Sequence, residues 1–145
     1  PATVQKPDIA QKMSPSQCIE SQSQCEINTE LANFSIKFSQ FQLSDKIKTE
    51  LPFIIEFSDS LFNSSKVSEI QTLNITKVSA YLEGKDMFMG KVPVFFEKVD
   101  NSNVFQAQSL LANCSEEQMV WRLWVTVESG EETQNFFVDF TSQRL

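Results

Sequence analysis

Four sulfur-containing side chains occur in two short, polar stretches of this chain. Met87 and Met89 lie within residues 83–90, where an extended backbone directs both side chains to the same side. Cys114 lies in a later polar stretch, and Met119 opens the apolar run that follows it. Thiolate and thioether sulfurs are soft donors, and copper(I) is the biological metal ion that suits them best. The residue types and their spacing therefore define a candidate copper(I) site.

A packing role explains the same residues without a metal. Methionine is a common gap-filler in hydrophobic cores because its side chain is long, unbranched and polarizable. Met119 is in phase with Trp121 and Leu123 in an alternating run, so it can simply belong to the core. The residues alone leave both interpretations open.

The chain contains no histidine, which narrows the chemistry available to it. Imidazole is the commonest general base near neutral pH and a very common metal ligand. We therefore expect no enzymatic activity. We also expect copper(I) and not copper(II), because imidazole or amine donors usually support the divalent ion.

The net charge and the lengths of the apolar runs limit which partners are expected. The formal net charge of -7 predicts repulsion from phosphate backbones and anionic lipid surfaces, so nucleic acid is not an expected partner. No apolar run approaches the roughly 20 residues that a membrane-spanning helix needs. The chain begins at Pro1 without an initiator methionine, so we expect a cleaved signal peptide or an anchor helix upstream. The sequence does not choose between these two.

Two further cysteines, Cys18 and Cys25, lie in the N-terminal stretch 1–33, which is rich in Gln, Ser, Pro and Lys. Together with Cys114 they make 3 cysteines, so one thiol must stay outside any intramolecular pair. We expect a disulfide between Cys18 and Cys25, which would close a small loop in a stretch with little core of its own. Two reduced thiols are the alternative. A metal pair is weaker because no further ligands lie nearby.

The elements that must position these residues are predicted to be β-strands. After residue 33, short runs of Phe, Ile, Val and Thr are bounded by Ser, Asn, Asp and Gly. Pro93 predicts an edge position for the fourth run, because proline cannot donate to a ladder. Residues 129–131 predict a tight hairpin between the last two runs. The expected strands are 34–43, 51–57, 75–83, 91–98, 104–111, 119–128 and 133–141.

Seven short strands at this spacing predict one all-β domain, an immunoglobulin-like sandwich of two sheets. The domain should span residues 34–145, after an irregular arm over residues 1–33 that shows no sustained period. Trp121 and Trp124 differ in parity, so one should face the core and the other the opposite side. The residues expected between the sheets are Phe38, Val78, Leu82, Phe96, Trp121 and Val125.

Two segments of the chain carry a resemblance to a known family. Residues 82–90, LEGKDMFMG, and 114–121, CSEEQMVW, resemble small bacterial immunoglobulin-like domains of the YtkA-like and related type. The resemblance covers residues 34–141 and leaves the N-terminal stretch uncovered. It implies a periplasmic or membrane-anchored protein linked with copper handling and respiratory oxidase assembly.

The resemblance also implies a site. The sulfurs of Met87, Met89, Cys114 and Met119 would converge, with Trp121 packed beneath or beside them. Other periplasmic copper chaperones combine methionine with histidine, and their site cannot be transferred to a chain that has no histidine.

The leading hypothesis is a periplasmic copper(I)-binding or copper-transfer domain that exchanges ligands with a copper donor or acceptor protein. Transfer of this kind displaces one thioether at a time and needs no catalytic base. The alternative is a structural or adhesive sandwich module that binds a protein through a sheet edge or an exposed Trp face, without a metal. A thiol-based redox function is the third hypothesis, weakened because neither cysteine pair has Cys-x-x-Cys spacing. We expect a periplasmic or other extracytoplasmic location, either free or tethered by an inner-membrane anchor outside this sequence.

Glycosylation is a competing interpretation of one of these stretches. Asn-x-Ser/Thr sequons occur at Asn33, Asn63, Asn74 and Asn113, and they would be acceptors in a eukaryotic secreted protein. A glycan on Asn113 would cover the sulfur residues, so this interpretation competes with the copper hypothesis. We favour the bacterial interpretation.

Overall fold

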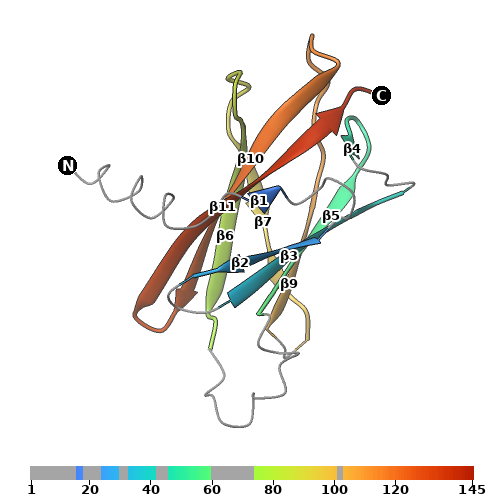
Figure 1. Ribbon diagram of the computed structural model, residues 1–145. Helices are drawn as coiled ribbons and strands as arrows, with labels where there is room; N and C mark the ends of the chain where they lie inside the picture. The colour runs from blue at the N-terminus through green and yellow to red at the C-terminus, as the bar shows by residue number, and fades with distance from the viewer. Residues whose placement is uncertain (1–15, 18–23, 30–32, 42–45, 60–73, 101–102) are drawn as a thin grey trace, which may run out of the picture.

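The computed structural model describes residues 16–17, 24–29, 33–41, 46–59, 74–100 and 103–145. All regular secondary structure in this part of the chain is β-strand. The strands form two sheets that pack face to face (Figure 1). The predicted all-β sandwich is therefore confirmed. No helix with the length and hydropathy needed to span a membrane occurs among these residues.

The first sheet has six strands in the order β1, β11, β10, β6, β7, and β4 also pairs with β11. Its centre is a long antiparallel hairpin in which β10 and β11 pair from Gln118 with Gln143 to Ser129 with Glu132. The strands are β1 (Ser16–Gln17), β4 (Ile47–Lys48), β6 (Lys77–Gly84), β7 (Val92–Phe95), β10 (Gln118–Ser129) and β11 (Glu132–Gln143).

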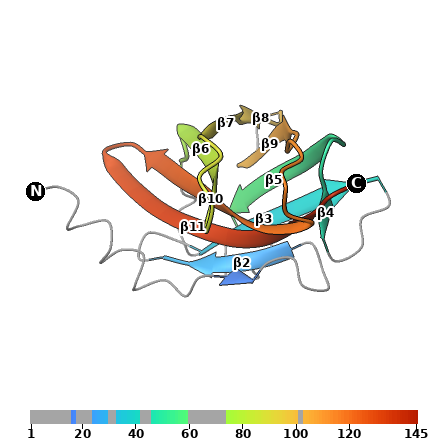
Figure 2. The ribbon, with the colours of Figure 1, turned by 90° about the horizontal axis from the view of Figure 1, so that it is seen from above.

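The second sheet has five antiparallel strands in the order β2, β3, β5, β9, β8. Figure 2 shows the two layers from above. In this view β7 and β8 lie one after the other between β6 of the first sheet and β9 of the second. The strands are β2 (Gln24–Asn28), β3 (Asn33–Gln40), β5 (Phe53–Asp59), β8 (Glu97–Lys98) and β9 (Val104–Ser109).

Two local signals in the sequence are confirmed. Gly130 has a φ of 61° in the two-residue connection between β10 and β11, a conformation that glycine adopts without steric cost. Pro93 lies in β7, which is the edge strand of the first sheet. Its missing N–H therefore removes no hydrogen bond from the interior of the sheet.

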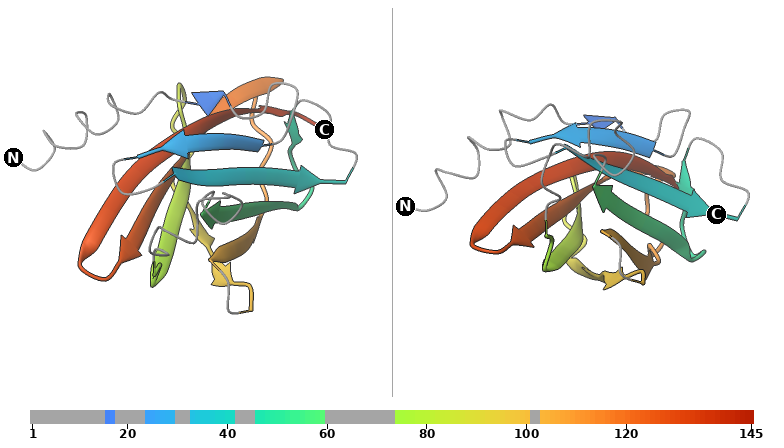
Figure 3. Two further views of the ribbon diagram at one scale, coloured as in Figure 1. Left: turned by 60° about the horizontal axis from the view of Figure 1, so that its bottom comes forward. Right: turned by 90° about the horizontal axis from the view of Figure 1, so that it is seen from below.

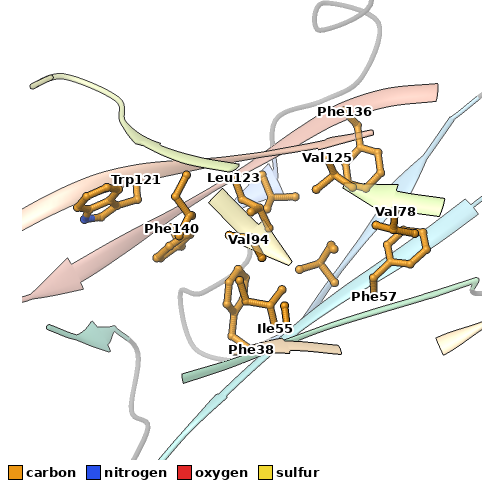
Figure 4. Packing of buried hydrophobic residues seen from close by; sticks show 14 of the residues in the cluster. Phe38, Ile55, Phe57, Val78, Val94, Trp121, Leu123, Val125, Phe136 and Phe140 are labelled. Atoms are coloured by element: carbon orange, nitrogen blue, oxygen red, sulfur yellow. The ribbon is translucent and has the colours of Figure 1, made fainter. Parts of the chain in front are cut away.

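The core lies between the sheets and combines aromatic rings with aliphatic side chains (Figure 4). Phe38 of the second sheet lies 4.9 Å from Phe140 of the first, measured between ring centroids, and Phe34 lies 5.9 Å from Phe136. Alternation along each strand directs these rings inward while polar neighbours face out. The two sheets are thus joined by contacts between side chains distant in sequence.

Five of the six residues predicted for the core are buried: Phe38, Val78, Leu82, Trp121 and Val125. The sixth, Phe96, is partly buried and packs against the core. It lies between β7 and β8, where the chain crosses from one sheet to the other. The single strand expected over 91–98 is therefore two short strands in different sheets.

The predicted irregular arm over residues 1–33 needs a correction. Ser16–Gln17 forms β1 and pairs with β11, and Gln24–Asn28 forms β2 and pairs with β3, as Figure 3 shows for β2. The sandwich therefore begins before residue 34. The strand pattern was missed because both strands are short and polar, and Ile27 is the one apolar residue of β2 known to be buried.

The two tryptophans lie on opposite faces of β10, as their parity predicts. Trp121 is buried between the sheets. Trp124 is on the outer face, where its ring lies 5.1 Å from Phe137 and 6.4 Å from Tyr81. Its indole N–H donates to the Glu83 carboxylate at 2.9 Å. Trp124 is therefore half-buried and hydrogen-bonded on the outer face.

Candidate metal centre

The two sulfur-bearing segments meet at one end of the sandwich. β6 ends at Gly84, which is paired with Trp121 near the start of β10. Beyond that rung, the Lys85 N–H donates to the Val120 carbonyl at 2.9 Å. We call this the sulfur end, made of residues 84–91 and 110–119.

Cys114 and Met119 are in direct sulfur contact. Cys114 Sγ lies 3.5 Å from Met119 Sδ, and the same distance from the carbonyl oxygen of Glu116. The Met119 side chain is 7% exposed, whereas Cys114 is half-buried and carries a free thiol. One soft donor therefore faces the core and its neighbour is accessible from solvent.

Gly84 brings the second segment to these sulfurs. A side-chain carbon built at Gly84 would overlap the carbonyl oxygen of Met87 and the terminal methyl of Met119. The backbone at Met87 and the side chain of Met119 therefore share the space that glycine leaves open. The glycine was visible in the sequence, but the contacts that require it join residues from two segments far apart in the chain.

Of the four predicted ligands, the structure shows two sulfurs in contact, those of Cys114 and Met119, while the backbone of Met87 lies beside Gly84. The side chains of Met87 and Met89 are partly buried and pack against the hydrophobic core. Met89 belongs to the same connection between β6 and β7. Its proximity to the other sulfurs stays a prediction.

Trp121 lies on the same face of β10 as Met119, two residues further along, and its packing against the sulfurs stays a prediction. It is buried, and its indole N–H donates to Ser142 Oγ at 3.1 Å. The Ser142 hydroxyl in turn lies 3.3 Å from the Met119 carbonyl. These hydrogen bonds fix the start of β10, on which Met119 lies.

The segment that carries Cys114 is held by residues far away in the sequence. The Arg144 guanidinium donates to the Cys114 carbonyl at 3.3 Å, and the Arg144 backbone N–H donates to the Glu117 carbonyl at 2.8 Å. At the other side, the Asn113 N–H donates to the Glu50 carboxylate at 2.9 Å. Neither Arg144 nor Glu50 belongs to a motif, so sequence reasoning did not find them.

The described residues include no group of three or more histidine, cysteine, aspartate or glutamate side chains that could hold a metal ion. A thiolate with thioethers is a donor set of the kind that copper(I) prefers, and the binding of a metal by these sulfurs stays a prediction.

The predicted disulfide is only half covered by the structure. The backbone of Cys25 lies in β2, where it pairs with Ile36 of β3. Cys18 lies outside the described residues. The pairing of these cysteines stays a prediction.

Comparison with known proteins bears on the fold. No family model matches this chain, and no curated protein matches it. A DUF4426 family protein from Pseudomonas aeruginosa has a similar structure, with a TM-score of 0.55 at 11% identity over 82% of this chain and 94% of its own. A DUF4785 family protein from Legionella pneumophila gives a TM-score of 0.53 at 16% identity, over 77% of this chain and 28% of its own. At these identities the likeness concerns the fold alone, and the resemblance to YtkA-like domains stays a prediction.

Proposed function

We propose that this domain binds copper(I) at the sulfur end and passes it to, or receives it from, a partner protein. The observation that carries the proposal is the 3.5 Å contact between Cys114 Sγ and Met119 Sδ, beside the loop that bears Met87 and Met89. A thiolate and thioethers from separate segments form a soft donor set of the kind copper(I) prefers.

The exposure of the two sulfurs suits ligand exchange. Cys114 is accessible and would be the anionic donor, while Met119 is held against the core. An incoming sulfur donor could replace the ligands one at a time from the solvent side. No step requires a base, so the absence of histidine does not hinder transfer. We expect no enzymatic activity.

The proposed partner follows from this chemistry, and the proposed location from the resemblance. A copper(I) donor or acceptor protein would have to present its own sulfur ligands to the sulfur end. The resemblance to YtkA-like domains favours the periplasm or another extracytoplasmic space, with an inner-membrane anchor as one form of attachment. These assignments rest on the sequence resemblance together with the sulfur contact.

A second candidate function is a protein-interaction module without a metal. The observation that favours it is Phe88, which lies between the two methionines and is 81% exposed. Exposed large apolar side chains at a loop are typical of protein-binding surfaces when they occur together. The two candidate functions differ in whether the Cys114 thiol is needed: copper(I) binding requires it, and protein binding through Phe88 does not.

A copper(I) competition titration decides between them. We expect the unmodified protein to withdraw copper(I) from a chromophoric chelator under anaerobic conditions. Cys114→Ser should weaken binding more than any single Met→Leu change at 87, 89 or 119, because the thiolate is the only anionic donor. The loss should be at least about tenfold, the scale already seen for outer-shell partners of metal sites.

The control variant is Met13→Leu, which removes a methionine that is not part of the predicted site. It should leave the copper(I) affinity unchanged. Equal affinity of the Cys114→Ser and unmodified proteins would mean that the sulfur contact is packing. The interaction module would then be the better description.

A further inference from the structure

A groove opens along the seam between the two sheets, where the chain passes from β7 to β8. Its volume is about 480 Å³. It lies toward the end of β6 that begins at Lys77, whereas the sulfur end begins at Gly84, the last residue of β6. Figure 2 shows β7 and β8 bridging the two layers on this side. The groove is therefore separate from the candidate metal centre.

The floor of the groove is the hydrophobic core itself. Val78, Val94 and Phe105 line it, and they keep 5%, 3% and 5% of their surface exposed. Leu82 and Leu123, deeper between the sheets, are completely covered. At the groove, therefore, a small part of the core surface remains open. An apolar ligand entering here would contact the core directly.

Phe95 forms one wall of the groove and stays 76% exposed. Covering an exposed phenyl ring removes apolar surface from water, so this ring offers binding free energy to a ligand that covers it. Since it contributes little to the core, Phe95 can also be replaced without emptying the interior. The ring therefore serves as a contact whose role can be tested.

Two ammonium groups stand at the same groove in a chain whose net charge is -7. Lys77 and Lys98 both line it and both are exposed. The Lys98 ammonium lies 5.7 Å from the Phe105 ring centroid, directly beside the apolar floor. Neither lysine forms an ion pair within the described part of the chain. A carboxylate at this rim would therefore meet two cations that form no ion pair among the described residues.

We propose that the seam groove binds a free, amphipathic monocarboxylate with a linear hydrocarbon chain. The hydrocarbon would lie on Val78, Val94 and Phe105 against the Phe95 ring, and the carboxylate would lie between Lys77 and Lys98. The volume falls within the range of roughly 300–1,000 Å³ typical of small-molecule sites. Charge complementarity selects the anionic head group over a neutral or cationic one.

Decanoate, used below the concentration at which it forms micelles, is the probe. We expect saturable shifts of backbone amide signals at residues 94–98 in two-dimensional nitrogen–proton NMR spectra. Decan-1-ol should bind more weakly, and decylamine should not bind measurably, because the head group meets two ammonium groups. Decanoate shifts that are absent, or that centre on residues 84–91, would overturn the proposal.

Charge and apolar contacts are separated by variants. Lys98→Gln and Lys77→Gln should each weaken decanoate binding by roughly threefold to fivefold, as expected for a partly exposed ion pair, and leave decan-1-ol unaffected. Lys37→Gln, on the exposed side of β3, is the matched control and should change neither. Unchanged decanoate affinity in the Lys77→Gln/Lys98→Gln double variant would overturn the proposal.

Phe95→Ser tests the wall of the groove. It should weaken decanoate and decan-1-ol alike, because the ring contacts the hydrocarbon and not the head group. The thermal unfolding midpoint should stay near that of the unmodified protein, since the ring is largely exposed. Unchanged binding of both ligands to this folded variant would contradict the proposed position of the hydrocarbon chain.

Discussion

At Gly84 the connection after β6 folds back against the strand it has just left. The space where a side chain would stand is taken by the Met87 carbonyl and the Met119 methyl, and the Met87 carbonyl carbon is 3.3 Å from it. Glycine is needed here for close approach of the backbone, in contrast to Gly130, which has a positive φ and open space around it. Glycine is thus required at position 84 by crowding and at position 130 by the backbone conformation.

Gly84→Ala should lower the free energy of unfolding by about 1–3 kcal/mol, because the added methyl overpacks the contact. It should also weaken copper(I) binding by displacing Met119 or the Met87 loop. Urea unfolding and the chelator competition measure the two effects. Gly130→Ala is the control: strain should destabilise it by about 1–2 kcal/mol, with no change in copper(I) affinity. Equal copper(I) affinities of Gly84→Ala and the unmodified protein would contradict this role.

Tyr81 gives a pH-dependent signal on the outer face of the first sheet. Burial, and then the nearby Glu83 carboxylate, raise the pKa of its hydroxyl above the ordinary value of 10.0. The folded state therefore holds this proton more tightly than the unfolded state does. Its contribution to stability is complete below pH 10.0 and is lost as the pH rises through the folded-state value.

The measurement is direct because Tyr81 is the only tyrosine in the chain. Ultraviolet absorbance of the tyrosinate should show a midpoint above 10.0 in the folded protein. In Tyr81→Phe, the loss of stability at alkaline pH should be smaller than in the unmodified protein. A midpoint at or below the ordinary value would show that burial and Glu83 do not act on this hydroxyl.

At the scale of elements, an ion pair joins β10 to β11 on the outer face. Arg122 donates two hydrogen bonds to the Asp139 carboxylate, at 2.8 and 3.0 Å, and its guanidinium carbon lies 4.0 Å from the Phe137 ring centroid. Hydrogen bonding to Asp139 raises the pKa of Arg122, so the arginine stays charged. The two side chains thus form a bidentate, charge-assisted pair, and Asp139 is buried.

Arg122→Met should lower the free energy of unfolding by about 3 kcal/mol, because it leaves the buried Asp139 carboxylate without its partner. The double variant Arg122→Met/Asp139→Leu should recover much of this loss, since no charge then remains buried. Urea unfolding of the two single variants and the double variant measures the coupling. Strictly additive losses would contradict the pairing.

Strand pattern was readable from the sequence wherever one face is buried. Alternation over Met119, Trp121 and Leu123 predicted β10, and Pro93 predicted an edge strand. β2 was missed because a short polar strand gives little periodic signal. The sulfur residues could be picked out by type, but Gly84, Arg144 and Glu50 could not, because their roles depend on contacts between segments far apart in the chain.

At the scale of the whole molecule, the two candidate sites lie at different ends of β6. The sulfur end begins at the last residue of β6, whereas the first residues of β6 line the seam groove. Variants at Lys98 or Phe95 should therefore leave copper(I) affinity unchanged, and variants at Cys114 should leave decanoate binding unchanged. The two proposals can fail independently.

The N-terminal cysteines concern the edge of the second sheet, where β2 carries Cys25. In protein isolated without reductant, peptide mapping should find Cys18 and Cys25 bonded to each other. Reduction should lower the free energy of unfolding by about 2 kcal/mol, as expected for a small loop. The Cys18→Ser/Cys25→Ser variant should show no response to reductant. Recovery of both cysteines as alkylated thiols from the unmodified protein would contradict the disulfide.

The hairpin of β10 and β11 is closed by the turn at Gly130 and open at Gln118 and Gln143, and Met119 lies at its open end. Strand ends far from the turn open locally more readily than the rungs beside it, and here the hydrogen bonds of Ser142 and Arg144 oppose that opening. An ion bridging Met119 and Cys114 would tie the start of β10 to the segment that precedes it, which Arg144 already links to the end of β11. Amide hydrogen exchange around Met119 would then slow on copper(I) binding, while the rungs beside Gly130 would exchange at an unchanged rate. Binding of copper(I) at the sulfur end would thus slow the local opening of β10 at Met119.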